Sequence, residues 1–207
     1  MTLTAFSLAG HTILITGASS GIGRTISIRA SQMGARVVLL GRDMTRLDET
    51  LAMLDGKDHL SVSMDLLKLH EIESALTPLL KSTGPLHGFV HSAGMAPTVL
   101  LRDLDTDRTE YLMRLNWLSF MALSQAICRR GRYAPGLSVV ALASISALTG
   151  QVGLSAYAGT KGALIASVRS LASEYAPRGI RFNCISPCPV ERSEEHTSEL
   201  QSRTVIS

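Results

Sequence analysis

The chain has 207 residues, of which 45% are hydrophobic and 18% are charged, so it suits one globular domain and excludes a disordered protein. Aromatic residues make up only 4%, which argues against base-stacking surfaces for single-stranded nucleic acid. The net charge of +3 comes from 20 basic and 17 acidic residues without a long basic run, so no nucleic-acid partner is expected.

Apolar runs rich in Val, Ile and Leu alternate with segments of helical period, which is typical of repeated βαβ units. The six predicted strands cover residues 12–16, 36–40, 60–64, 88–91, 137–143 and 181–186. Helices are predicted between them at residues 22–33, 45–54, 69–81, 107–130 and 155–175. A glycine suited to a C-terminal cap follows four of the helices, at Gly34, Gly56, Gly84 and Gly131. The pattern predicts a single α/β domain, with a Rossmann-like, doubly wound parallel sheet and helices on both faces.

The segment TGASSGIG, residues 16–23, joins the first predicted strand to the first predicted helix. In such a turn Gly17 permits the tight bend, Gly21 lets the backbone approach a pyrophosphate, and Gly23 allows close packing of the helix. The helix N-terminus adds free N–H groups and a partial positive charge. We therefore expect a dinucleotide phosphate site here, and the alternative is a glycine-rich turn without a ligand. The residues expected to form it are Gly17, Ser19, Ser20, Gly21, Ile22 and Gly23.

The end of the second predicted strand indicates which dinucleotide is bound. An acidic residue is expected there to accept a hydrogen bond from the adenosine ribose, but Gly41 and Arg42 occupy the place. Arg42 can bind a 2′-phosphate, so NADP(H) is favoured over NAD(H). The alternative is that Arg42 is a solvated loop residue beside Asp43, which could itself turn inward. After the third strand, Asp65 and Leu66 are expected near the adenine, unless Asp65 caps the next helix.

Candidate catalytic residues lie near the start of the last predicted helix. Tyr157 and Lys161 are four residues apart, so both side chains emerge on one helix face. A tyrosine has an unperturbed pKa near 10, so it needs a positive charge nearby to exchange protons near neutral pH. Ser144 lies thirteen residues before Tyr157 at the carboxyl end of the fifth predicted strand. Ligands in open α/β sheets bind at that edge, although Ser146 is a competing candidate.

These motifs together resemble the short-chain dehydrogenase/reductase family over essentially all of residues 5–191. In chain order they are TGASSGIG at 16–23, Asp65, HSAG at 91–94, Asn116, Ser144, YAGTK at 157–161 and SPCPV at 186–190. The resemblance implies an oxidoreductase that transfers a hydride between a nicotinamide and a small carbonyl or alcohol substrate. It also implies a homo-oligomer, either a tetramer or a dimer.

The resemblance further implies a role for each matched residue. Tyr157 is the general acid/base, Ser144 holds the substrate oxygen, Lys161 binds the nicotinamide ribose and favours the phenolate of the tyrosine, and Asn116 anchors a water in the proton relay. The alternative for Asn116 is an ordinary polar residue in a long helix. Further cofactor contacts are expected from Ser92, Ala93, Gly94, Pro187 and Val190, besides Tyr157 and Lys161.

Two motifs depart from the family pattern. His91 and Ser92 replace the asparagine pair that usually precedes Ala93 and Gly94. We expect a structural rather than a catalytic role for His91, because a lone histidine at a strand end is more often structural. Cys188 replaces a glycine, which either strains a turn near the nicotinamide or reflects a sequence error.

The last sixteen residues, RSEEHTSELQSRTVIS, carry no Gly, Pro, aromatic residue or apolar periodicity. The first eleven match the in-frame translation of a common sequencing adapter. We therefore expect residues 1–191 to be an incomplete NADP(H)-binding domain that lacks a seventh strand and a substrate lid, and residues 192–207 to be an artefact. An unpaired sixth strand predicts poor solubility or inactivity. The alternative function is therefore a non-catalytic or folding-defective nucleotide-binding fragment.

Cellular location and substrate are only partly indicated. Three irregularly spaced cysteines predict neither a disulfide framework nor a metal site, and a reducing compartment is expected. The first residues contain no basic segment before an apolar run, and no apolar run is long enough to cross a bilayer, so a cytoplasmic protein without a membrane partner is expected. Residues 95–101 and 148–154 suggest an apolar substrate pocket.

Overall fold

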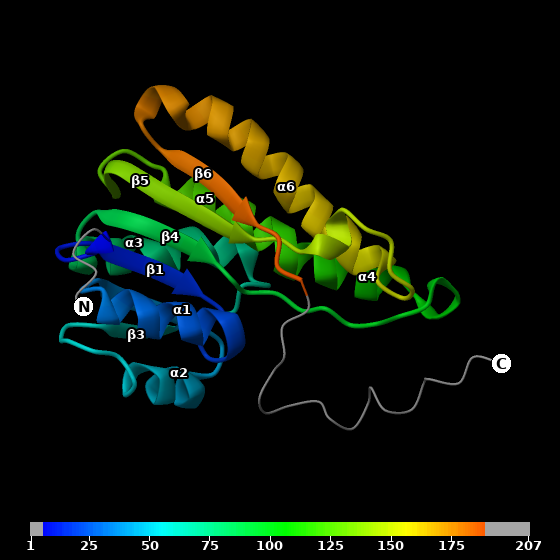
Figure 1. Cartoon of the computed structure of the whole chain (residues 1–207), viewed down its shortest axis with the longest axis horizontal. Helices are drawn as coiled ribbons and strands as arrows, with labels where there is room; N and C mark the ends of the chain where they lie inside the picture. Colours follow the sequence, from blue (N-terminus) through cyan, green and yellow to red (C-terminus); the bar gives the residue numbers. More distant parts are fainter. Residues whose placement is uncertain (1–5, 189–207) are drawn as a thin grey trace.

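The computed structural model describes residues 6–188, so the predictions for Val190 and for residues 192–207 lie outside the described residues. Six parallel strands form one sheet in the order β3-β2-β1-β4-β5-β6. The strands are β1 (Thr12–Thr16), β2 (Arg36–Gly41), β3 (Leu60–Ser63), β4 (Leu86–His91), β5 (Tyr133–Leu142) and β6 (Arg181–Ile185). Every pairing in the sheet is parallel, as the arrows of β4, β5 and β6 in Figure 1 show for one half of it, so the segments that follow the strands lie at one end of the sheet.

Helices cover both faces of this sheet, as predicted. They are α1 (Gly21–Gln32), α2 (Met44–Leu51), α3 (Ile72–Thr83), α4 (Thr106–Met113), α5 (Ser119–Ile127) and α6 (Ser155–Tyr175). On one face α1 and α2 pack around Ile15, Val37 and Leu39. On the other face α3, α5 and α6 pack around Leu14, Phe89 and Val139. This arrangement follows from right-handed crossovers, because the chain first moves outward from β1 to β3 and then reverses to β4. The predicted Rossmann-like architecture is therefore confirmed.

Predicted bounds agree with the structure where the signals are local. β1 and α6 have the predicted limits, and all four expected capping glycines have positive φ, at Gly34, Gly56, Gly84 and Gly131. The main difference in a strand is β5, which begins at Tyr133 rather than at residue 137. Pro135 and Gly136 interrupt the apolar run, and the pairing with β4 shifts register there. The β-strand therefore continues through a segment whose composition indicates a turn.

The helix predicted over residues 107–130 is not uniform. Its α-helical parts, α4 and α5, are separated by a π-helical turn at Arg114–Leu118, and α5 ends at Ile127. In this turn the Ser119 N–H bonds to the Arg114 carbonyl, five residues back. Such single-turn π segments occur frequently at functional sites. Asn116 lies within this turn and is fully buried.

Candidate active site

The glycine-rich turn and the end of β4 meet where the strand order reverses. Gly17 has φ +65°, and a Cβ added there would lie 2.8 Å from the Ala93 backbone nitrogen. A Cβ on Gly23 would overlap the Gly17 carbonyl oxygen, so both glycines are required by close packing. Gly21 also has positive φ, but a Cβ there would meet nothing within 4 Å. The first turn of α1 therefore faces open space at the topological switch point, where such sheets bind ligands.

Two side chains that the sequence analysis missed brace this turn. The Arg24 guanidinium donates to the Ser19 carbonyl at 2.6 Å and to Thr50 Oγ1 at 2.9 Å. Thr50 Oγ1 in turn donates to the Ala18 carbonyl at 3.0 Å. These bonds connect the turn after β1 to α2. No sequence motif indicates these hydrogen bonds, because Arg24 binds a main-chain carbonyl and the side chain of Thr50, which is 26 residues away in the sequence.

Arg42 lies directly after β2, beside the glycine-rich turn. A Cβ on Gly41 would lie 3.6 Å from Ser19 Oγ, so the end of β2 adjoins that turn. Arg42 is exposed, and within residues 6–188 its guanidinium has no hydrogen-bond or ion-pair partner. Asp43 instead caps α2, where its Oδ1 accepts from the Arg46 N–H at 3.1 Å. The carboxylate is thus engaged by its own helix, and the arginine side chain is available.

Asp65 and Leu66 follow β3 at the same edge of the sheet. Asp65 Oδ1 accepts a hydrogen bond from the Leu67 N–H at 3.0 Å, and the Leu66 side chain is buried. Asp65 therefore stabilises a local turn rather than capping α3, whose N-cap residue is Glu71.

Lys161 and Asn116 converge on the backbone that follows β4. The Lys161 ammonium is buried and donates to the Leu142 carbonyl at 2.6 Å. Burial lowers the pKa of Lys161 from 10.5 to about 8. A Cβ on Gly94 would lie 3.0 Å from Asn116 Oδ1 and 3.5 Å from Lys161 Nζ, so only a glycine backbone fits between them. The Tyr157 ring centroid lies 5.8 Å from Lys161 Nζ.

The Asn116 side chain holds the segment after Gly94 in place. Its Oδ1 accepts from the Met95 N–H at 2.9 Å, and its Nδ2 donates to the Met95 carbonyl at 2.9 Å. Nδ2 also donates to Thr160 Oγ1 at 3.0 Å, and Thr160 donates to the Tyr157 carbonyl. The π-helical turn is therefore connected through Thr160 to the helix that carries Tyr157.

Ser144 and Ser146, the two candidates for holding the substrate oxygen, belong to one hydrogen-bonded group. Ser144 Oγ accepts from the Ser146 N–H and lies 3.2 Å from Ser146 Oγ, which donates to Gln151 Oε1 at 2.8 Å. The Tyr157 hydroxyl forms no hydrogen bond with any residue in the range 6–188, so the structure does not join Ser144 directly to Tyr157. The Pro187 carbonyl accepts from the Ile145 N–H at 3.1 Å, which places the segment after β6 beside Ser144.

The two departures from the family pattern behave differently from each other. His91 is fully buried, and burial is the main cause that lowers its pKa to about 3. This fits the expected non-catalytic role. Cys188 is exposed, and among the described residues Asp58 is the only non-glycine with positive φ. The strained turn expected at Cys188 is therefore not found.

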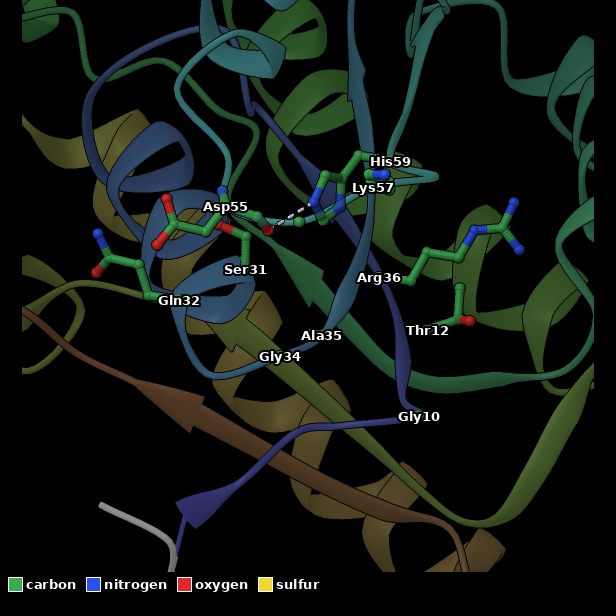
Figure 2. Close-up of a pocket in the computed structure, with 11 residues that line it drawn as sticks. Gly10, Thr12, Ser31, Gln32, Gly34, Ala35, Arg36, Asp55, Lys57 and His59 are labelled. Atoms are coloured by element: carbon green, nitrogen blue, oxygen red, sulfur yellow. Dashed lines mark hydrogen bonds between the residues drawn. The ribbon is translucent and has the colours of Figure 1, made fainter. Parts of the chain in front are cut away.

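A groove at the opposite edge of the sheet is a different kind of feature. Figure 2 shows it beside the amino ends of β1 and β2, with Ser31, Asp55 and His59 among its lining residues. His59 Nδ1 accepts from the Val37 N–H, and Nε2 bonds to the Asp55 carbonyl at 2.9 Å. Ser31 Oγ accepts from the Asp55 N–H. These polar groups are paired with one another, and none of the predicted site residues lines the groove.

Other features bear on the class of protein. No helix within residues 6–188 has both the length and the apolar character needed to cross a membrane. The same residues contain no group of three or more side chains able to hold a metal ion.

Comparisons with known proteins agree on one family. The family model described as short chain dehydrogenase matches residues 11–203. The chain is 32% identical over 174 residues to carbonyl reductase family member 4 of Danio rerio, covering 84% of this chain and 73% of that protein. It is 33% identical over 173 residues to a 3-oxoacyl-[acyl-carrier-protein] reductase of Mus musculus, covering 84% of this chain and 72% of that protein.

Solved structures give the same result. A dehydrogenase/reductase from Sinorhizobium meliloti 1021 superimposes with a TM-score of 0.86 at 26% identity, covering 92% of this chain and 76% of that one. A protein described as a short-chain dehydrogenase, from Escherichia coli CFT073 and in complex with NADPH, superimposes with a TM-score of 0.83 at 27% identity. That match covers 89% of this chain and 79% of the other.

Proposed function

The chain belongs to the short-chain dehydrogenase family, and we propose that it transfers a hydride between NADP(H) and the carbonyl or alcohol carbon of a small apolar substrate. Membership makes it an NAD(P)-dependent oxidoreductase. The main support for the proposed hydride transfer is that the side chains of Lys161 and Asn116 both lie against the Gly94 backbone. Lys161 is also one helical turn from Tyr157 in α6. When bound, the nicotinamide supplies or accepts the hydride.

The residues present fit such a cofactor. The open space at Gly21, together with the N-terminus of α1, suits a pyrophosphate. Lys161 is a buried ammonium with three donors, of which one is bound to Leu142. A buried charge of this kind needs further partners, and ribose hydroxyls would satisfy the two remaining donors.

Arg42 supports the preference for NADP(H). Arg42 follows Gly41, whose Cβ position adjoins Ser19, and its exposed guanidinium has no partner among the described residues, whereas Asp43 is occupied as the cap of α2. A 2′-phosphate at this place would give Arg42 a bidentate, charge-assisted pair. The solved E. coli protein with bound NADPH is consistent with this assignment.

Tyr157 is proposed as the general acid/base. The Lys161 ammonium lies 5.8 Å from the centroid of the Tyr157 ring, so a group able to hold the nicotinamide ribose adjoins the proposed acid/base. During reduction the Tyr157 hydroxyl would donate its proton to the developing alkoxide, and during oxidation it would take that proton back. Ser144 Oγ would hold the substrate oxygen, after exchanging its contact with Ser146 for one with the substrate.

The proposed substrate has an apolar body. The two segments expected to form the pocket lie side by side, because the Val99 N–H donates to the Gly153 carbonyl at 2.7 Å. Between them they expose Met95, Leu148 and Val152, the last at 84% of its surface. Exposed large apolar side chains grouped beside a catalytic edge are typical of a binding surface.

Cofactor binding tests the proposal. Isothermal titration of NADPH and NADH should show tighter binding of NADPH, and Arg42→Asp should remove this preference. Arg130→Asp, which makes the same charge change at another exposed arginine, should not. Binding followed by NADPH-dependent turnover of aldehydes and ketones would support the enzyme. NADPH binding without turnover would favour the nucleotide-binding fragment instead. In that case the Tyr157→Phe variant would behave as the parent chain does.

We further infer that residues 1–191 carry this function, because every site residue named above lies within them. A chain ending at residue 191 should therefore bind NADPH as the 207-residue chain does. Weaker NADPH binding by the chain that ends at residue 191 would contradict the assignment of the function to residues 1–191.

A further inference from the structure

His91 is a buried titratable side chain that the proposed reaction does not use. It lies at the carboxyl end of β4 and pairs in register with Thr16 of β1. Its ring is completely enclosed, with the rings of Phe89 and Phe120 at centroid distances of 6.2 and 5.5 Å. A polar ring in such surroundings is costly unless its nitrogens find partners.

Thr16 determines which nitrogen of His91 carries the hydrogen. Thr16 Oγ1 accepts hydrogen bonds from the Ser92 and Ala93 N–H groups, both at 3.1 Å. A hydroxyl has two acceptor positions and one hydrogen, so both acceptor positions are filled. The remaining hydrogen must point to the third neighbour, His91 Nδ1, at 3.2 Å. Nδ1 is therefore an acceptor, and a neutral ring carries its hydrogen on Nε2.

The surroundings of His91 keep the ring neutral. Burial and the positive charge of Lys161 both lower the pKa of His91, to about 3, while the Asn116 backbone opposes them. Nε2 is buried and has no hydrogen-bond partner among the described residues. The hydrogen bond to Thr16 Oγ1 is therefore the only side-chain hydrogen bond of the ring among the described residues.

We propose that His91 is a positioning residue that orients the Thr16 hydroxyl and thereby holds the backbone of Ser92, Ala93 and Gly94 in place. This proposal rests on the proposed function, since that backbone meets the glycine-rich turn and the Lys161 ammonium. Without the acceptor at Nδ1, the Thr16 hydroxyl loses the partner for its hydrogen. Its two bonds to Ser92 and Ala93 then compete with other orientations of the hydroxyl.

The tautomer tests the proposal without reference to activity. Nitrogen NMR of the histidine rings in the full chain, with His91→Asn to assign the signal, should show a neutral His91 with its hydrogen on Nε2 from pH 6 to 8. A hydrogen on Nδ1, or a doubly protonated ring, would overturn the proposal. This result stands even if the chain binds no NADPH, in which case the proposed function fails independently.

Substitutions test the consequence for the cofactor. His91→Leu removes both nitrogens, and we expect the Kd for NADPH to rise about tenfold, the effect of losing one buried hydrogen bond. His91→Asn supplies an acceptor and a donor and should restore the Kd to within about twofold. Phe89→Leu, at a fully buried neighbour on the same strand face, should lower Tm while leaving the Kd within about twofold.

Equal Kd values for His91→Leu and His91→Asn would overturn the proposal, as would a tenfold effect of Phe89→Leu. If His91→Leu does not yield folded protein, Thr16→Val and Thr16→Ser take its place. The valine variant should raise the Kd about tenfold, while the serine variant, which keeps the hydroxyl, should remain within about twofold. Equal values for these two variants would also overturn it.

Discussion

Lys161 should make the stability of the chain depend on pH in an unusual direction. Lys161 is 5% exposed, and burial lowers its pKa from 10.5 to about 8. In the unfolded chain the same group titrates near its ordinary value of about 10.4. Between pH 8 and about 10.5 the unfolded state therefore binds more protons than the folded state.

Because the unfolded state holds the extra proton in this window, the free energy of unfolding rises with pH there. Below pH 8 both states are protonated, and the folded state bears the full cost of burying the charge. Above about pH 10.5 both states are neutral, and that cost is gone. The difference between the two pKa values corresponds to about 3 kcal/mol.

Lys161→Met isolates this contribution, because it removes the charge and keeps most of the side-chain length. Urea unfolding of the parent chain and the variant between pH 7.5 and 10.5 gives the difference in their free energies of unfolding. We expect this difference to move in favour of the parent chain by about 3 kcal/mol as the pH rises. Lys57→Met, at an exposed lysine, should show a constant difference. A constant difference for Lys161→Met, or one that moves the other way, would refute the reasoning.

Two further substitutions test the packing of the site. Asn116→Ala removes three hydrogen bonds, to Met95 and Thr160, so urea unfolding should show that the free energy of unfolding falls by about 3 kcal/mol. The exposed control Asn183→Ala should lower it by at most about 0.5 kcal/mol. A fall of less than about 1 kcal/mol for Asn116→Ala would contradict the importance of these bonds. Gly17→Ala forces a Cβ to within 2.8 Å of Ala93 at positive φ, so it should cost about 1–3 kcal/mol and weaken NADPH binding. Gly150→Ala, where a Cβ meets nothing within 4 Å, is its control, and equal behaviour of the two variants would contradict the packing argument.

The sequence predicts the features that depend on local chemistry. β1 and α6 were predicted with their observed limits, because an apolar run bounded by glycine and a long helical segment are visible in one window of sequence. The roles assigned to Gly17 and Gly23 match their packing for the same reason. Each of these features is specified by residues that are near one another in the chain.

Features that depend on distant partners were not predictable in this way. The π-helical turn at Arg114–Leu118 differs from an α-helix by one extra residue in its hydrogen-bonded loop, which leaves the apolar periodicity nearly unchanged. The bracing of the glycine-rich turn by Arg24 requires α1 to lie beside α2. Spacing from Tyr157 favoured Ser144 over Ser146, but only the structure shows that the two hydroxyls lie in one hydrogen-bonded group with Gln151.

The buried polar side chains of the site share the kind of group to which they bind. Thr16, Asn116 and Lys161 bind mainly to backbone groups, namely the Ser92 and Ala93 N–H, both polar groups of Met95, and the Leu142 carbonyl. Each of these backbone groups belongs to the end of β5 or to the segment after β4. Side chains from β1, the π-helical turn and α6 therefore hold in place the segments that would face a nicotinamide. Removing one side chain leaves its backbone partner unpaired in a region with little water, which costs more than the bond itself contributes. The same bonds place the Lys161 charge and the Gly94 backbone before any cofactor binds, and a site arranged in advance needs little reorganisation when charge develops on a substrate oxygen.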